Sequence, residues 1–415
     1  MSKNPEILKL LVHAVPFSMV YGVVWGVASM ALPLLAGSAS RAGLVFAMLN
    51  LGVAIGAPVW GHLARHRSVT WLILLSTLLA GLGWVGLTLL GNWLLPFTAF
   101  AFGLFAAGTF ALATVQVTRI FPRAEWDAYI ANMQSLMVLG QVLGLLATSV
   151  YAGAALGVPF LLAGLIAAAW LARGLMRREQ PAKPAQPRHR WHLRSPHALL
   201  PGILHGHHLR QLNLRGVFTL RSAYVAMILT RWTLLILAWA PIFAIYPLLM
   251  HHAFGLANAQ SSLIYSGSTA LSVPLFLLAG RVARRVSSVL SMTLGALSSL
   301  VAFVLMYTAL LQGNGPLGAA GFVLMVCAYG FVAVGMNDGI VGAVSAEKEG
   351  DALGAANALM SLDNVLGGIV GGTLVAAFGY GVLFIIGFAL SALALGFGIV
   401  SARLRQASAR MAAAE

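Results

Sequence analysis

The sequence predicts an all-helical integral membrane protein with twelve transmembrane helices in two pseudo-symmetric six-helix bundles. Hydrophobic residues make up 60% of the 415 residues and charged residues only 8%, whereas a soluble domain carries roughly 25% charged residues. The apolar residues fall into twelve long runs, and features of the first six runs recur in the last six. With so few charged residues the chain could not cover a surface that faces water, so we expect its helices to be surrounded by lipid.

Each apolar run is close to the roughly 20 residues that an α-helix needs to cross a bilayer. The first run exceeds the roughly 7–15 residues of a signal-peptide core, so we expect it to be retained. The intervening loops are short, which favours antiparallel neighbours. The predicted spans are 12–35, 43–64, 69–91, 95–119, 129–152, 156–176, 222–250, 259–280, 287–311, 316–341, 352–376 and 380–402.

The net charge of +15 is mainly a sign of topology, because the arginines concentrate in alternate loops. If the N-terminus is cytoplasmic, Arg41 is the only arginine in an outer loop, as the positive-inside rule requires. The outer loops are short, and the chain has no Asn-x-Ser/Thr site. We therefore expect a multi-pass protein of a bacterial inner membrane, with both termini cytoplasmic and no nucleic-acid partner.

A polar, basic segment divides the two sets of runs. We expect an N-terminal bundle at 1–176, a cytoplasmic linker at 177–221, and a C-terminal bundle with a short tail at 222–415. The linker is rich in Arg and His and has one acid, Glu179. We interpret it as a solvated tether near anionic headgroups. Metal binding by its histidines is the alternative, but no Cys or carboxylate completes a site, so we expect neither a metal nor a cofactor.

Sequence features recur between the halves at nearly constant offsets. A Trp followed eight residues later by Pro-Leu-Leu occurs in the first and seventh runs, with an offset of 214 (239 − 25 and 247 − 33). The pattern Gly-x-(Leu/Val)-Ala-Arg-x-x-Ser follows the second and eighth runs, at 61–68 and 280–287. The fifth and eleventh runs share Ala-Asn, Ser-Leu and Val-Leu-Gly pairs. Together these matches indicate a duplication with conserved orientation.

On these features the chain resembles the major facilitator superfamily, over nearly its whole length. The resemblance implies a secondary transporter whose two halves rock around a central site. The loops after the second and eighth helices depart from the family pattern, because Arg65 and Arg284 stand where an acid is usual. The fourth predicted helix also lacks the family's frequent arginine, and the fifth lacks the Gly-Pro motif of antiporters. These departures concern coupling rather than fold.

Two acids within predicted helices are candidates for proton or ion coupling. Asp363 lies midway along the span 352–376, and Asp338 lies near the inner end of the span 316–341. Ionisable residues inside a membrane are costly and usually functional, and a carboxylate that moves between dry and wet surroundings can carry a proton. Alternatively, Asp363 is a structural acid that pairs with a polar neighbour, and Asp338 marks a hydrated helix end.

Five residues are candidates to line a substrate cavity. Trp25 and Trp239 occupy equivalent positions and could stack on a flat compound, or simply pack. Arg231 could face the cavity, as a partner for the deep acid or for an anionic substrate, or could reach the interface. Gln141 and Asn364 are repeat-equivalent amides that either contact substrate or hold helices together.

The altered loops predict a cytoplasmic gate with reversed polarity. In the family that the chain resembles, the loop after the second helix meets the start of the eleventh. The predicted pairs are Arg65 with Glu349 or Asp351, and Arg284 with Glu125 or Asp127. Such exposed pairs contribute only about 0–1 kcal/mol each, and solvated loop charge is the alternative.

These observations favour a monomeric secondary active transporter that works by alternating access. We expect proton-coupled export of a small hydrophobic or amphipathic organic compound, because the predicted cavity is apolar and aromatic with a single deep acid. Uptake or facilitated transport of a small organic anion or weak acid through Arg231 is one alternative, and a non-transporting binding or regulatory protein of the same fold is another. We expect no enzymatic activity, because no nucleophile with a base, P-loop or metal motif occurs in the sequence.

Overall fold

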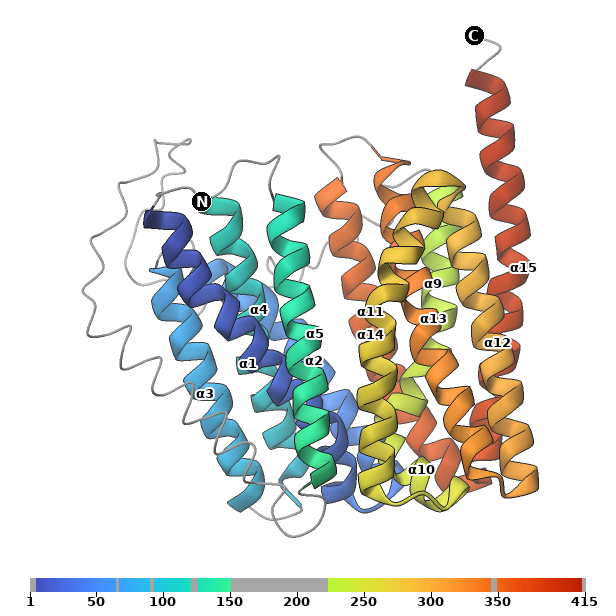
Figure 1. The fold of residues 1–415 in the computed structure, drawn as a ribbon, viewed down its shortest axis with the longest axis horizontal. Coiled ribbons are helices and arrows are strands. Elements are labelled where there is room, and N and C mark those ends of the chain that lie inside the picture. Colours follow the sequence, from blue (N-terminus) through green and yellow to red (C-terminus); the bar gives the residue numbers. More distant parts are fainter. Residues whose placement is uncertain are drawn as a thin grey trace, which may run out of the picture.

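The computed structural model describes residues 5–64, 67–89, 93–120, 126–150, 223–344 and 349–412, which are built of helices joined by short turns (Figure 1). Seven of the described helices are long and apolar enough to cross a membrane, so the predicted all-helical membrane fold is confirmed. The predicted span 156–176 and the linker 177–221 lie outside the described residues. The helices are α1 (Pro5–Ala36), α2 (Ala39–Leu63), α3 (Val69–Leu89), α4 (Leu95–Ile120), α5 (Trp126–Val150), α9 (Ala223–Ala244), α10 (Tyr246–Phe254), α11 (Asn258–Arg285), α12 (Ser288–Gln312), α13 (Gly315–Val341), α14 (Glu349–Phe378) and α15 (Gly381–Ala412).

The helices form two groups that stand side by side (Figure 1). Helices α1 to α5 make up one group and α9 to α15 the other. The start of α1 and the end of α15 lie at the same end of the molecule, which we call the terminal end. An even number of crossings produces this arrangement, as the sequence predicts.

The opposite end, which we call the turn end, carries tight turns built on glycine. Four turn glycines have left-handed backbones, with φ between 63° and 78°, a conformation that other residues adopt at a cost. They separate α1 from α2, α10 from α11, α12 from α13 and α14 from α15, and are Gly37, Gly255, Gly313 and Gly379. The N-cap of α13 reinforces one turn, because Asn314 Oδ1 accepts the backbone N–H of Leu317 at 3.0 Å.

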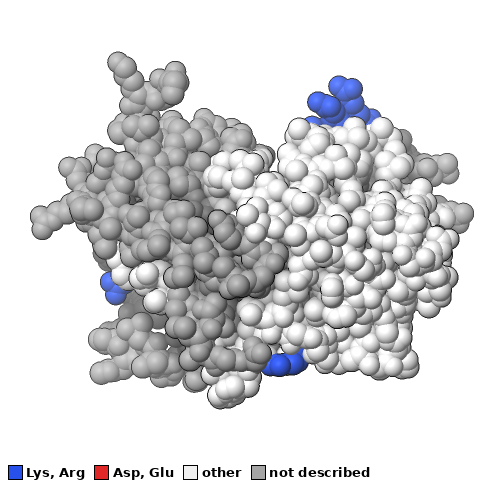
Figure 2. All heavy atoms as spheres, turned by 60° about the horizontal axis from the view of Figure 1, so that its bottom comes forward, with Lys and Arg blue, Asp and Glu red and all other residues white. Residues whose placement is uncertain are grey.

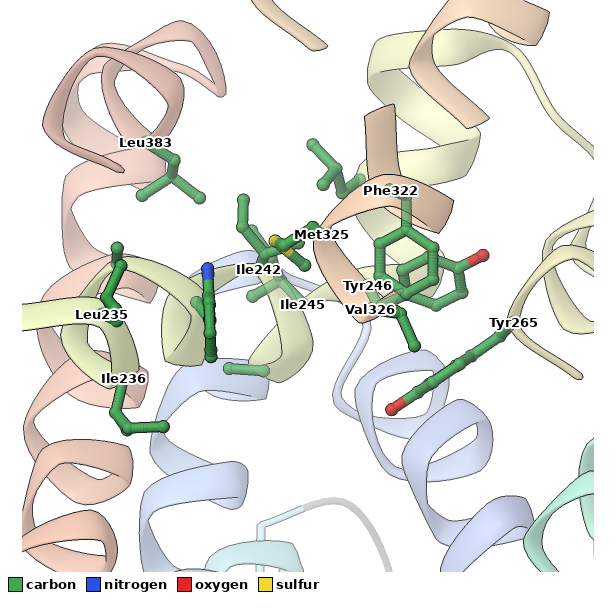
Figure 3. Packing of buried hydrophobic residues seen from close by; sticks show 14 of the residues in the cluster. Leu235, Ile236, Ile242, Ile245, Tyr246, Tyr265, Phe322, Met325, Val326 and Leu383 are labelled. Atoms are coloured by element: carbon green, nitrogen blue, oxygen red, sulfur yellow. The ribbon is translucent and has the colours of Figure 1, made fainter. Parts of the chain in front are cut away.

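The predicted span 222–250 is not one continuous helix. It is divided at Ile245 into α9 and α10, because Pro247 has no N–H to donate to the preceding turn. Aromatic packing holds the break, since the Tyr246 ring lies 4.1 Å from that of Phe322 and 4.9 Å from that of Tyr265 (Figure 3). The Tyr246 hydroxyl also donates to the carbonyl of Ser261 at 2.8 Å.

The outer surface of the helices suits lipid. Large apolar side chains are exposed along the helices, such as Leu277 at 64% and Phe378 at 73%. Figure 2 looks partly onto the turn end and partly along the sides of the helices; the described atoms of this face are almost all uncharged, and a few Lys and Arg atoms lie at its margins. Hydrocarbon tails can cover such a surface without loss of hydrogen bonds.

Arg231 is a fully buried charge that joins three helices of the second group. Its side chain is 0% exposed, and its Nε donates to the carbonyl of Ala394 on α15 at 3.1 Å. Its Nη2 donates to the Thr293 hydroxyl on α12 at 3.0 Å. Gly398 on α15 leaves room for the guanidinium, because a Cβ there would lie 2.9 Å from Nη2. Arg231 therefore connects α9 to α12 and α15.

We predict that Gly398→Ala lowers the stability of the protein by about 1–3 kcal/mol, because the added methyl displaces a packed, bonded guanidinium. The measurement is the thermal unfolding midpoint of the purified protein in detergent. Gly396→Ala is the matched control, since a Cβ at Gly396 meets open space. Equal midpoints for the two variants would contradict the assigned role of Arg231.

Candidate functional site

Asp363 is buried at the interface of α14 and α9. The side chain is 3% exposed, and its Oδ2 atom has no hydrogen-bond partner in the described part of the chain. The Thr233 hydroxyl on α9 is its hydrogen-bonding neighbour. Of the side chains that the structure describes, only Asp363 and Arg231 are both charged and buried. A carboxylate held this way in a membrane span is a strong functional candidate.

Arg231 and Asp363 lie on opposite sides of α9. Arg231 and Thr233 are two positions apart, which turns their side chains by about 200° around a helix. Thr233 faces α14 and the acid, whereas Arg231 faces α12 and α15. The sequence offered Arg231 as a cavity residue. In this structure its guanidinium instead holds α9 to α12 and α15.

Aromatic rings from α9 and α11 surround Tyr329, at the middle of α13. The Tyr329 ring lies 6.2 Å from Trp232, 6.0 Å from Trp239 and 6.0 Å from Phe276, between ring centroids. Trp239 is 1% exposed, and its indole N–H donates to the Ser299 hydroxyl at 2.6 Å. The predicted cavity residue Trp239 is thus covered by Tyr329, which is half-buried.

The sequence reasoning missed Trp232, Phe276 and Tyr329. One signal was available for Trp232: it precedes Trp239 by seven residues, or about two helical turns, so both leave α9 on the same face. Tyr329 and Phe276 carry no comparable signal, because their partners come from other helices.

Trp25 has different surroundings from its repeat partner Trp239. It is half-buried on α1 and stacks on Tyr21 of the same helix, with ring centroids 5.9 Å apart. The two halves therefore place equivalent tryptophans differently, one partly open and one covered.

The remaining predicted site residues are dispersed. Gln141 is half-buried on α5 where α5 meets α1, because a Cβ on Gly26 would lie 2.4 Å from its carbonyl oxygen. Asn364 is half-buried beside Asp363 on α14, and Asp338 is exposed near the terminal end of α13. The structure does not bring these three side chains together.

The predicted cytoplasmic gate lies mostly outside the described residues. Arg65 and Glu125 fall in undescribed segments, and Asp127, Glu349 and Asp351 lie at the starts of α5 and α14 with undescribed side chains. Arg284 is exposed in the last turn of α11, on the terminal end shared by the starts of α5 and α14 (Figure 1). The ion pairs of the gate stay a prediction.

Glycines bring the two helix groups into backbone contact between α2 and α14. A Cβ on Gly43 would lie 2.1 Å from the carbonyl oxygen of Gly368 and 3.0 Å from the Cα of Gly372. A Cβ on Gly372 would in turn lie 2.6 Å from the carbonyl oxygen of Ala39. Small residues permit such close helix approach in membranes. Because Ala39 and Gly43 begin α2, this contact lies toward the turn end.

Hydroxyl groups connect the same two groups between α5 and α11. The Ser262 hydroxyl donates to the carbonyl of Leu145 at 2.5 Å and lies 2.5 Å from the Thr148 hydroxyl. The Ser266 hydroxyl donates to the carbonyl of Val142 at 3.1 Å. These residues lie in the first turns of α11 and the last turns of α5, again toward the turn end. We call the two contacts together the inter-half seam.

Comparison with known proteins identifies relatives at the level of the fold. The sequence matches the family model of the Major Facilitator Superfamily over residues 15–362, whereas no curated protein matches it. A solved D-xylose-proton symporter is 16% identical with a TM-score of 0.71, covering 94% of this chain and 97% of its own. A POT family transporter in complex with 5-aminolevulinic acid is 14% identical with a TM-score of 0.74, covering 95% and 96%. A variant of the nucleoside transporter NupG is 14% identical with a TM-score of 0.72, covering 95% and 99%.

We predict that Ser262→Ala opens the turn end more often, because the substitution removes one of the two α11 hydroxyls that donate to carbonyls of α5. One hydrogen bond is worth about 0.5–1.5 kcal/mol, so closure should weaken roughly two- to tenfold. The measurement is the rate at which a membrane-impermeant maleimide labels Ala42→Cys, a buried position near the start of α2, in a Cys327→Ser background.

Ser268→Ala is the control for this experiment. Its hydroxyl donates to the carbonyl of Tyr265 within α11 at 2.8 Å, so its loss should leave the labelling rate unchanged. The seam loses its assigned role if both variants label at the same rate as the parent.

Proposed function

Since the chain belongs to the Major Facilitator Superfamily, we propose that it is a secondary active transporter that exports a small hydrophobic or amphipathic organic compound in exchange for protons. The membership and the transporter fold indicate a transporter rather than an enzyme. The direction, the proton and the substrate class are the proposed parts.

The observation that carries proton coupling is the burial of Asp363 with one unpartnered carboxylate oxygen. A charged group without a full set of partners is expensive in a dry span. Its protonation state is therefore tied to whether water reaches it, which is the property that a coupled carrier needs. Its position between α14 and α9 also means that movement of either helix changes its surroundings.

Alternating access requires two bodies that open at one end while they close at the other. We propose that 1–176 and 222–415 are these bodies, with 177–221 as the linker. The inter-half seam supports closure at the turn end. The positive-inside pattern supports an orientation with both termini in the cytoplasm and the turn end outside, and we propose a bacterial inner membrane as the location. We propose that the protein works as a monomer in the lipid bilayer, with a small-molecule substrate and protons as its partners.

The chemistry of the interior supports an apolar or aromatic substrate. The solved structures named above include a nucleoside transporter, a D-xylose-proton symporter and a POT family transporter in complex with 5-aminolevulinic acid. The fold therefore accommodates chemically unrelated solutes. Uptake of an anion through Arg231 is disfavoured, because its guanidinium already binds Ala394 and Thr293. The aromatic residues around Tyr329 favour a compound with flat apolar groups.

The testing experiment follows protons released by the purified protein in weakly buffered detergent as compounds are added. The panel contains lipophilic cations, weak acids and neutral aromatic compounds. We expect at least one compound to release protons from the parent and none from Asp363→Asn, because the amide has the shape of the acid but carries no exchangeable charge.

Asp338→Asn is the comparison variant, since Asp338 is exposed near a helix end. We expect it to release protons like the parent. Binding without release in the parent would make Asp363 structural and point to another coupling ion or to uniport. Absence of binding across the panel would favour a non-transporting member of the family.

A further inference from the structure

Tyr329 has the properties of a residue that contacts a ligand. It lies at the middle of α13, and its ring has three aromatic neighbours, from α9 and α11. Its side chain is nevertheless half-buried rather than covered. Its hydroxyl makes no hydrogen bond to the residues that the structure describes. A phenol at mid-membrane depth normally has a partner for this group.

Trp232 supplies a second unused donor beside the same ring. Its side chain is 1% exposed, and its buried Nε1–H has no hydrogen-bond partner in the described part of the protein. Indole nitrogens that are buried usually donate to something. The N–H is covered in this conformation, so an acceptor reaches it only when the residues that cover it move.

Trp239 provides an internal comparison for Trp232. Both indoles contact the Tyr329 ring, and both are almost fully buried. The N–H of Trp239 is satisfied by the Ser299 hydroxyl at 2.6 Å, so this tryptophan is a complete structural contact. The unused N–H of Trp232 is therefore a property of its own position and not of buried tryptophans in this core.

We propose that Trp232, Tyr329 and Phe276 form a substrate subsite for a planar aromatic compound that carries a neutral hydrogen-bond acceptor. The rings of the three residues offer flat apolar surface for an aromatic system. The indole N–H and the phenol O–H are donors, so they pair with a carbonyl, ether or ring-nitrogen acceptor. The three side chains carry no formal charge, so the subsite has no ionic preference of its own.

The same turn of α9 connects this subsite to Asp363. Trp232 faces Tyr329 on α13, and the next residue, Thr233, faces Asp363 on α14. A ligand that contacts Trp232 therefore acts on the same helix turn whose Thr233 neighbours the acid. This connection rests on the proposed function, whereas the existence of the subsite does not.

Two naphthalenes that differ only in the acceptor test the subsite. The probes are 2-acetylnaphthalene and 2-ethylnaphthalene, which have closely similar shapes, and only the former can accept a hydrogen bond. Binding is measured by equilibrium dialysis of the full chain in lipid nanodiscs, with empty nanodiscs subtracted to remove partition into lipid. We expect 2-acetylnaphthalene to bind more tightly.

Tyr329→Phe removes the hydroxyl and keeps the ring, and Trp232→Phe removes the indole N–H and keeps a smaller aromatic ring. Tyr329→Phe should weaken binding of 2-acetylnaphthalene roughly three- to tenfold, the effect of one lost hydrogen bond, and leave 2-ethylnaphthalene nearly unchanged. Trp232→Phe should weaken 2-acetylnaphthalene by a similar further factor relative to 2-ethylnaphthalene, because the smaller ring affects both probes and the lost N–H affects only one. The matched controls are Tyr307→Phe and Trp93→Phe, at exposed positions, which should change neither affinity. Thermal unfolding midpoints verify that the variants are folded.

The outcomes separate the subsite from the transport proposal. Equal weakening of both probes, no weakening of either, or no binding of 2-acetylnaphthalene by the parent each overturns the subsite. Selective weakening of the acetyl probe supports it, whether or not binding releases protons. Proton release that depends on Asp363, together with unchanged binding of both probes by Tyr329→Phe and Trp232→Phe, leaves the transport proposal intact and removes the subsite.

Discussion

The cost of an unpaired polar group in a dry membrane interior is the constraint on which the rest of this structure depends. It explains why the backbone is helical and why hydroxyls such as those of Thr77 and Ser268 donate back to their own helices. It also explains why the charge of Arg231 is bound to a carbonyl and a hydroxyl. In the described residues, three buried side-chain atoms have no hydrogen-bond partner, and they belong to Trp232, Asn258 and Asp363. Two of these three adjoin the same turn of α9.

Helix α9 brings the main features together because successive residues face different neighbours. Arg231 is bonded to α12 and α15, Trp232 packs on α13, and Thr233 faces Asp363 on α14. The hydrogen bonds of Arg231 fix this turn of α9 against α12 and α15. On its other sides the turn contacts α13 and α14 through Trp232 and Asp363, which each have an unused hydrogen-bonding atom. The inter-half seam begins within two turns of this site along α14, because Gly368 follows Asp363 by five residues, so local changes at α9 can reach it through helix packing.

Much of the fold could be predicted from the sequence, because membrane spans and repeats are recorded in local patterns. The depth of Asp363 followed from its distance to the ends of an apolar run. The break at Ile245 was missed although Pro247 was visible, because proline is tolerated within membrane helices when neighbours satisfy the freed groups. The partners of Arg231 and the aromatic residues around Tyr329 could not be predicted, since they come from helices far apart in the chain. The seam was equally hidden, because glycine and serine are frequent throughout such helices.

The central claim is that Asp363 couples its protonation to opening of the turn end. The most direct measurement is the distance between spin labels on Trp93→Cys and Leu311→Cys, exposed positions near the turn end of the two groups, in a Cys327→Ser background. We expect the distance distribution of the parent to shift between acidic and alkaline pH, and that of Asp363→Asn to stay fixed. An identical shift in both proteins would contradict the claim, because a group other than Asp363 would then control the opening.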